Sequence, residues 1–210
     1  MLSHRLDESL ELTCLQRSQA EPLFALIQTH RAYLSHWLSW PQEIQSLEDT
    51  QSFIRYSLQQ FVAGQTRLYA LMFRGELVGI CGCNAINKRL QRVRLGYWLA
   101  EPWQGQGIVT RACRWLIAMA FEQWQMAVVE IAVAQDNHRS RAVCERLGMQ
   151  PTICIPQAEQ LADRLVDHLI YTLSREQWLA GDMAATDYSA GWRPYMLRGL
   201  LVKEVVGKRR

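Results

Sequence analysis

One stretch of the sequence, residues 92–121, constrains the fold more than any other. Residues 93–99 form an apolar run typical of a strand, and the breaker pair Glu101-Pro102 follows it. A turn containing Gly105 and Gly107 then leads directly into a long helical pattern. The sequence therefore predicts a strand, a loop and a helix that starts at a glycine-bearing turn.

This turn has the properties of an anion site. The first amides of a helix have no partner within it and lie at the positive end of the helix dipole, so they favour a phosphate group. Here those amides belong to Ile108, Val109 and Thr110, and the side chains of Gln104 and Thr110 add donors at the rim. A Walker loop would need a lysine, and a dinucleotide fingerprint would need a third glycine near position 110. Both patterns are absent here, and an ordinary tight turn remains the alternative interpretation.

Neighbouring segments narrow the choice. Gly-Tyr-Trp-Leu at 96–99, Trp-Gln-Gly-Gln-Gly-Ile at 103–108, Asp-Asn-His-Arg-Ser at 136–140 and Leu-Gly-Met at 147–149 resemble, in order and spacing, the Gcn5-related N-acetyltransferases. Within that superfamily the chain looks most like the ribosomal-protein N-acetyltransferases, of the type that acetylates the amino-terminal serine of the acidic stalk protein of the large ribosomal subunit. The resemblance covers roughly residues 8–178.

The pattern of the remaining chain predicts an α/β (α+β) domain over residues 1–180. The resemblance implies a mixed, mostly antiparallel sheet of about seven strands, with helices on both faces and a splay between the fourth and fifth strands. A capping box at Ser46 and Asp49 predicts the start of the second helix, Asp136 is a plausible cap for a later one, and Gly148 closes that helix. The expected strands are residues 8–15, 68–73, 77–83, 93–99, 127–134, 152–155 and 167–173, with a polar, partly helical insert around 157–164.

Residues 181–210 depart from the family pattern. They are predicted to form a C-terminal extension that either packs on a neighbouring subunit or is a flexible tail, with a short amphipathic helix at 196–206. The sequence does not determine the oligomeric state. The resemblance leaves a homodimer as one option, because relatives often pair, and the 8 tryptophans of the chain are compatible with an interface.

Composition excludes several classes of protein. The chain has 49% hydrophobic and 20% charged residues, and no apolar run approaches membrane-spanning length, so we expect a cytoplasmic protein with no membrane partner. The 6 cysteines lack metal-site spacing, which indicates no metal and reduced core thiols. A net charge of +3 is too small to indicate direct binding of nucleic acid.

The resemblance implies acetyl-CoA as the co-substrate. Main-chain groups of the strand ending at Leu99 would pair with its pantetheine arm and stabilise the oxyanion, while the side chains of Tyr97 and Trp98 read as core aromatics. Asn137 matches a cofactor-contacting amide, with helix capping as its competing role. The residues expected to hold acetyl-CoA are Trp98, Leu99, Gln104, Gly105, Gln106, Gly107, Ile108, Val109, Thr110 and Asn137.

Acetyl transfer from a thioester needs a neutral amine, a donor for the oxyanion and a proton for the departing thiolate. Many relatives supply that proton from a tyrosine on the helix after the fifth strand, and residues 136–150 contain none. The resemblance points instead to Ser140 as the acid and to Glu159 as the base. A route through Cys81 or Cys83 would need a base beside the thiol, which the sequence does not indicate, so direct transfer is favoured.

The acceptor is the least constrained part of the hypothesis. An α-amino group has a pKa of about 8 against about 10.4 for lysine, so it needs only a modest base. Residues 87–94 are rich in basic side chains and form either a solvated loop or a docking patch for an acidic protein, with Arg89, Arg92 and Arg94 as candidate substrate-binding residues. Many relatives carry a carboxylate at the position of Arg94. The alternatives are acetylation of a polyamine or aminoglycoside, and a non-catalytic acyl-CoA sensor.

Overall fold

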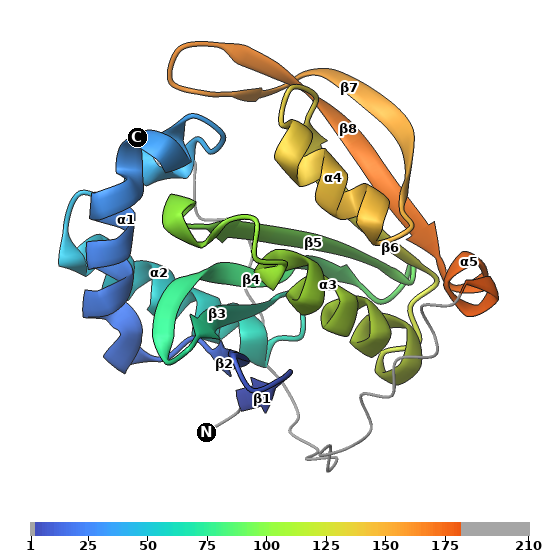
Figure 1. Ribbon diagram of the computed structural model, residues 1–210, viewed down its shortest axis with the longest axis horizontal. Coiled ribbons are helices and arrows are strands. Elements are labelled where there is room, and N and C mark those ends of the chain that lie inside the picture. Colours follow the sequence, from blue (N-terminus) through green and yellow to red (C-terminus); the bar gives the residue numbers. More distant parts are fainter. Residues whose placement is uncertain (1–2, 182–210) are drawn as a thin grey trace.

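The computed structural model describes residues 3–181, which form one eight-stranded sheet with helices on both faces (Figure 1). The strand order is β1-β2-β3-β4-β5-β6-β8-β7, and only the β5–β6 pair is parallel. This confirms the predicted mixed, mostly antiparallel α/β fold, with one strand more than expected. The strands are β1 Ser3–Arg5, β2 Leu10–Cys14, β3 Arg67–Phe73, β4 Glu76–Asn87, β5 Arg92–Leu99, β6 Val128–Ala134, β7 Gln150–Gln160 and β8 Leu165–Ser174.

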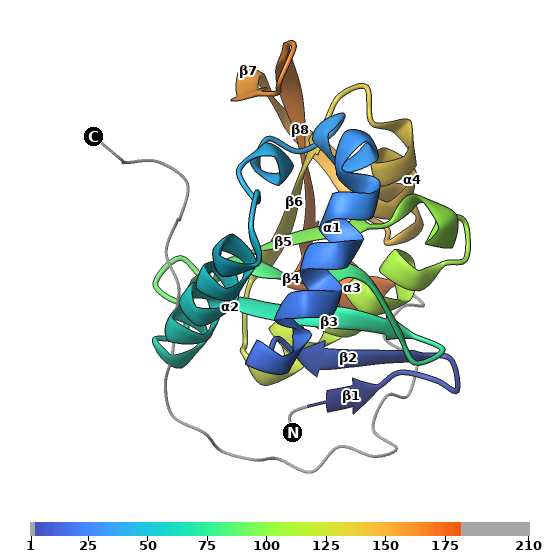
Figure 2. The same cartoon turned by 90° about the vertical axis from the view of Figure 1, so that its left-hand side faces the viewer.

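The helices divide between the two faces of the sheet, α1 and α2 on one and α3 and α4 on the other (Figure 2). The predicted capping box starts α2, because Ser46 and Asp49 bond reciprocally. No helix within residues 3–181 is long and apolar enough to cross a bilayer. The α-helices are α1 Ala20–Ser35, α2 Leu47–Val62, α3 Ile108–Ala118, α4 His138–Arg146 and α5 Arg175–Ala180, and the shorter helical turns are η1 Arg17–Gln19, η2 Trp40–Gln42, η3 Glu101–Trp103 and η4 Met119–Gln123.

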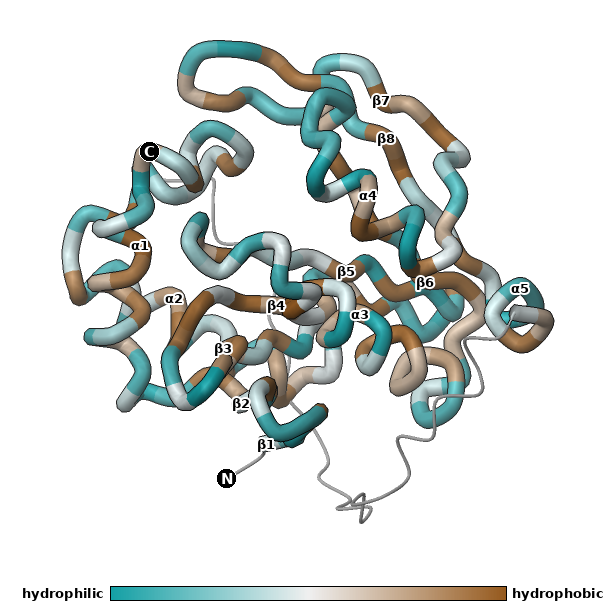
Figure 3. The backbone as a smooth tube through the Cα atoms, in the orientation of Figure 1, coloured by the Kyte–Doolittle hydropathy of each residue, from teal (hydrophilic) through white to brown (hydrophobic). Residues whose placement is uncertain are grey.

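Alternation along the strands gives the sheet two apolar faces. In β3, Leu71 is buried in the large core on the side of α3, whereas its neighbour Ala70 packs under α1 and α2. On the α3 side, Leu116 and Phe121 are fully buried. Figure 3 shows the central strands as hydrophobic segments bounded by hydrophilic loops. The two cores therefore pack against opposite faces of the sheet on either side of the place where β5 and β6 separate.

Three local predictions were wrong. The basic connection expected at 87–94 is shorter, because β4 continues to Asn87 and β5 starts at Arg92, one residue before the expected strand. The insert around 157–164 is not helical, since β7 continues past a register shift and pairs again with β8 at Glu159. The cap of α4 is not Asp136 but Asn137, whose side chain accepts the amide hydrogen of Ser140. The extension expected at 181–210 lies, from 182 onward, outside the described residues.

Candidate active site

A cleft opens where β5 and β6 stop pairing. The two strands are bonded only from Arg92–Val128 to Leu95–Ile131, and beyond that point they diverge, as the resemblance implied (Figure 1). The cleft has a volume of about 910 Å³ and is walled by residues 97–99 of β5, 132–134 of β6, the turn at 104–110 and one side of α4. Every residue predicted to hold acetyl-CoA, together with Ser140 and Glu159, lies on its wall.

The glycine turn at the start of α3 presents free amides to this cleft. Gly107 is the N-cap of α3 and supplies no side-chain cap, so the first amides of the helix have no partner within it. Gly105 and Gly107 have φ values of +75° and +70°, and no heavy atom lies within 4 Å of a Cβ built at either position. Left-handed backbone, not crowding, therefore favours glycine here. The open, amide-lined turn fits a pyrophosphate.

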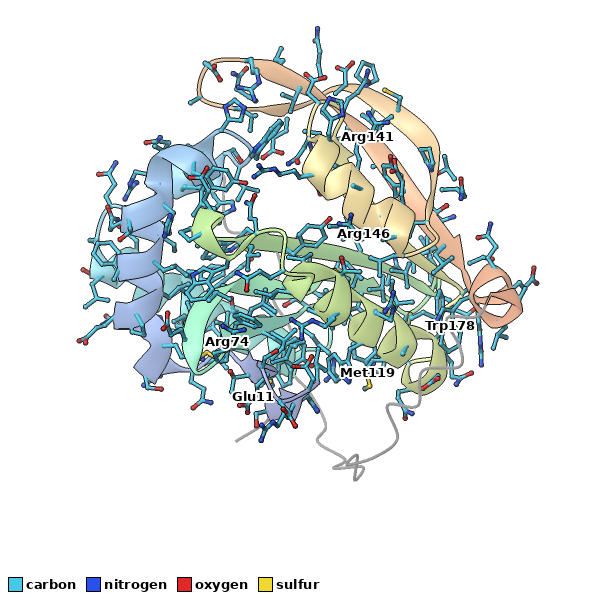
Figure 4. All side chains as sticks on the ribbon, in the orientation of Figure 1. Glu11, Arg74, Met119, Arg141, Arg146 and Trp178 are labelled. Carbon is cyan, nitrogen blue, oxygen red and sulfur yellow. The ribbon has the colours of Figure 1, made fainter. Side chains whose placement is uncertain are left out.

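A chain of hydrogen bonds crosses the same turn. The guanidinium of Arg139 on α4 donates to the side-chain oxygen of Gln104, whose amide nitrogen donates to the hydroxyl of Tyr33 on α1. Arg146, also on the cleft wall, lies between α4 and β5 in Figure 4. The sequence did not predict Tyr33, Arg139 or Arg146 as residues of the site. Arg139 falls inside the motif at 136–140, but nothing in the helical pattern of α1 distinguishes Tyr33 from its neighbours.

Ser140 is held between Asn137 and Tyr97. Its backbone amide donates to the side-chain oxygen of Asn137 at 3.0 Å, so that oxygen of Asn137 is used for capping. Its hydroxyl shares a hydrogen bond of 2.8 Å with the phenol of Tyr97, which also donates to the Ser140 carbonyl at 3.3 Å. Burial raises the pKa of Tyr97 well above its usual value, so the phenol stays protonated. The phenol beside Ser140 comes from β5, a neighbour that only tertiary structure creates.

Glu159 also lies on the cleft wall, where its carboxylate contacts side chains of two other segments. Its Oε1 accepts a hydrogen bond from the Ser39 hydroxyl at 2.7 Å, and its Oε2 lies 3.2 Å from Nε2 of His168 on β8. The hydrogen bond to His168, and then that to Ser39, lowers the pKa of the Glu159 carboxyl despite partial burial. The carboxylate is therefore ionised at neutral pH. Ser39 and His168 were not predicted, because each is a lone polar residue in the sequence.

Residues 9–150 match the model of the acetyltransferase (GNAT) domain family. The chain belongs to this family. It is 32% identical over 167 residues to the ribosomal-protein-serine acetyltransferase of Escherichia coli (strain K12), covering 80% of this chain and 93% of that protein. The GNAT fold also aligns with a solved ribosomal L7/L12 alpha-N-protein acetyltransferase, RimL, in complex with coenzyme A, at a TM-score of 0.79 and 28% identity over 84% of this chain and 99% of the other. A microcin C7 self-immunity acetyltransferase, MccE, solved with acetyl-CoA and AMP, shares the fold at a TM-score of 0.75 and 24% identity over 80% of this chain and 94% of that one.

The other residues that the sequence suggested for the site of this GNAT acetyltransferase, three arginines and two cysteines, lie outside the cleft. Arg92 and Arg94 are half exposed on the paired part of β5, where both bond to the buried Glu130 of β6. Arg89 is exposed in the β4–β5 turn. Cys81 and Cys83 are fully buried, and burial raises the pKa of the Cys83 thiol far above its usual range. Among residues 3–181 no group of acidic, histidine or cysteine side chains could hold a metal ion.

Proposed function

We propose that this acetyltransferase transfers an acetyl group directly from acetyl-CoA to the α-amino group of an amino-terminal serine, with an acidic ribosomal stalk protein as the acceptor. The observation that carries the proposal is the cleft between β5 and β6, which brings together the free amides of α3, the Ser140–Tyr97 pair and Glu159. The sequence match to a ribosomal-protein-serine acetyltransferase supports the acceptor class.

Residues at two places suit the co-substrate. The amides at 105–110 suit its pyrophosphate, with Gln104 at the rim. Ala100 donates to Val78 of β4, and antiparallel ladders alternate, so Trp98 also directs its main-chain groups to β4. The main-chain groups of Tyr97 and Leu99 then face the gap beside β6 and are free to pair with an extended pantetheine arm. Trp98 contributes its side chain to the cleft wall.

Bound acetyl-CoA supplies the thioester, and the chain supplies the proton transfers and the charge stabilisation. The amide of Leu99 is placed to donate to an oxyanion in the gap. Ser140 protonates the departing sulfur, and the Tyr97 phenol behind it keeps that hydroxyl oriented. Glu159, ionised and on the wall of the same cleft, serves the amine side of the reaction.

The charged side chains on the cleft wall suit an acidic protein better than a polycation such as a polyamine. The charged and imidazole side chains on its wall are two carboxylates, two guanidiniums and one histidine: Glu101, Glu159, Arg139, Arg146 and His168. A polyamine pocket would need an excess of carboxylates. An acidic protein is better matched, and we assign its docking to the cationic patch formed by Arg89, Arg92 and Arg94 at the start of β5. Arg92 and Arg94 share the one carboxylate of Glu130, so the patch keeps a positive excess.

A thiol-release assay tests the proposal. Purified protein is given acetyl-CoA with a serine-starting acidic peptide, with the same peptide already acetylated at its amino terminus, or with spermidine. We expect release of free CoA only with the unmodified peptide. Preference for spermidine would assign a small-amine acetyltransferase. Acetyl-CoA binding without CoA release from any of these acceptors would indicate an acyl-CoA sensor.

A further inference from the structure

His168 contacts the carboxylate of Glu159, the residue assigned to the amine side of the reaction, but the proposed function gives His168 itself no role. Both oxygens of Glu159 are engaged, one by Ser39 at 2.7 Å and the other by Nε2 of His168 at 3.2 Å. The side chains of His168 and Glu159 are only 18% and 28% exposed, yet both line the cleft. An imidazole that donates from Nε2 can accept a proton at Nδ1.

Proton affinity favours the imidazole over the carboxylate as acceptor. The hydrogen bond from His168 lowers the pKa of the Glu159 carboxyl, which makes it a weaker base than an ordinary glutamate. An α-ammonium has a pKa of about 8, an imidazole about 6.5 and a glutamate about 4.3. General bases work best when their proton affinity lies near the operating pH, so an imidazole is the better match to this amine.

We propose that His168 accepts the proton of the attacking amine and that Glu159 is its positioning residue. The inference rests on the proposed function. The amine nitrogen forms a bond to the thioester carbon as the carbon–sulfur bond breaks, one amine proton passes to Nδ1 of His168, and the departing sulfur takes the proton of Ser140. Water then removes the proton from His168 and restores that of Ser140, so the enzyme ends unchanged.

The Nε2 atom of His168 contacts Glu159, which leaves the Nδ1 atom to accept a proton. Its neighbours across the ladders are Ala134 on β6 and Ile155 on β7, which are apolar. Among residues 3–181, Nδ1 has no hydrogen-bond partner. Glu159 on β7 is the charged group in contact with the ring. The charged or titratable groups elsewhere on the cleft wall are Glu101, Arg139 and Arg146. Those on neighbouring segments are Asp167, whose carboxylate accepts the amide hydrogen of Gln157, and His36 with Arg164 beside the end of α1.

The pH dependence of kcat/KM tests the inference. In wild-type protein both the amine and the imidazole must be unprotonated, so log kcat/KM decreases by about two units for each unit that the pH is lowered, in the acidic range where Glu159 is still ionised. His168→Gln removes one ionisation, so the slope falls to about one and kcat/KM at pH 7.5 drops by about 10²-fold. Glu159→Gln lowers kcat but keeps the slope of two, because the imidazole is still present.

Controls separate this result from a loss of structure. His30→Gln removes an imidazole from α1 away from the cleft wall and leaves the profile unchanged. His168→Asn is the second variant, and thermal stabilisation by acetyl-CoA shows that each variant is folded.

The outcomes separate the inference from the proposed function. A slope of two that persists in folded His168→Gln and His168→Asn, or a wild-type slope of one, overturns the assignment of His168 alone. Wild-type protein that acetylates no peptide amine overturns the proposed function, and the inference falls with it.

Discussion

At the scale of single residues, Tyr97 and Ser140 are two hydroxyl groups in contact on the cleft wall, and we propose that Ser140 is the one that protonates the thiolate. The two hydroxyls are 2.8 Å apart, and burial keeps the phenol protonated. If Ser140 is the donor, Ser140→Ala lowers kcat by about 10²-fold and leaves the KM for acetyl-CoA unchanged. Tyr97→Phe removes only the hydrogen bond that orients the Ser140 hydroxyl, so we expect kcat to fall by about tenfold, equivalent to about 1.4 kcal/mol. Steady-state CoA release measures both, and a larger loss in Tyr97→Phe would make the tyrosine the acid.

The left-handed backbone of the glycine turn gives a second prediction at this scale. Alanine at Gly107 meets no atom within 4 Å but must adopt φ +70°, which costs about 1–2 kcal/mol. The turn would relax and misplace its amides, so Gly107→Ala raises the KM for acetyl-CoA.

Gly75→Ala is the matched control for that variant. Gly75 has φ +84°, equally open space and a place in the β3–β4 turn, away from the cleft wall. Urea denaturation should show a similar loss of stability in both variants, with the KM changed only in Gly107→Ala. A raised KM in both variants would mean that general destabilisation, not the position of these amides, explains the effect.

At the scale of elements, Asp7 ties the β1–β2 turn to α3. Its Oδ1 accepts bonds from the Ser9 hydroxyl at 2.7 Å and amide at 2.8 Å, and its Oδ2 pairs with Arg111. Partial burial alone would raise the pKa of Asp7, but the Ser9 bonds and Arg111 outweigh it and lower the pKa from 3.8 to about 2. The pKa of Asp7 is lower in the folded than in the unfolded protein, so its ionised carboxylate adds to the free energy of unfolding. This contribution is complete above pH 3.8 and is lost as the pH falls through about 2.

Asp7→Asn tests this tie. The variant should unfold at a lower urea concentration than wild type at pH 7, and the difference between the two should shrink between pH 4 and 2. A difference in midpoint that stays constant over this range would show that the carboxylate charge contributes nothing.

At the scale of the whole molecule, the cleft links binding to stability. Its walls come from α1, β5, β6, α3, α4 and the β7–β8 pair, so a ligand filling it contacts elements from both sides of the splay. At one hundred times its Kd, a ligand that binds only the folded state adds about 2.7 kcal/mol, which corresponds to a rise in Tm of about 5–10 °C. Differential scanning calorimetry with acetyl-CoA measures the shift, and an unchanged Tm at millimolar ligand would remove the cofactor from this cleft.

The sequence by itself determined the features that depend on local chemistry. Left-handed turns favour glycine and helix starts favour capping residues, so the turn at Gly105 and Gly107 and the cap at Ser46 were readable from neighbouring letters. Buried strands have continuous apolar runs, which placed β6 correctly. Order and spacing of the motifs then indicated the family and the residues on the cleft wall.

Tertiary structure alone decided which distant side chains meet. Tyr97 and Ser140 are 43 positions apart, and Ser39 and Glu159 are 120 apart, so no local pattern could pair them. Their contacts arise because β5 leaves β6 after Leu95 and because the β7–β8 hairpin returns over the end of α1. A side chain's chemistry belongs to its residue type, but its protonation and its partner depend on what the folded sheet brings beside it.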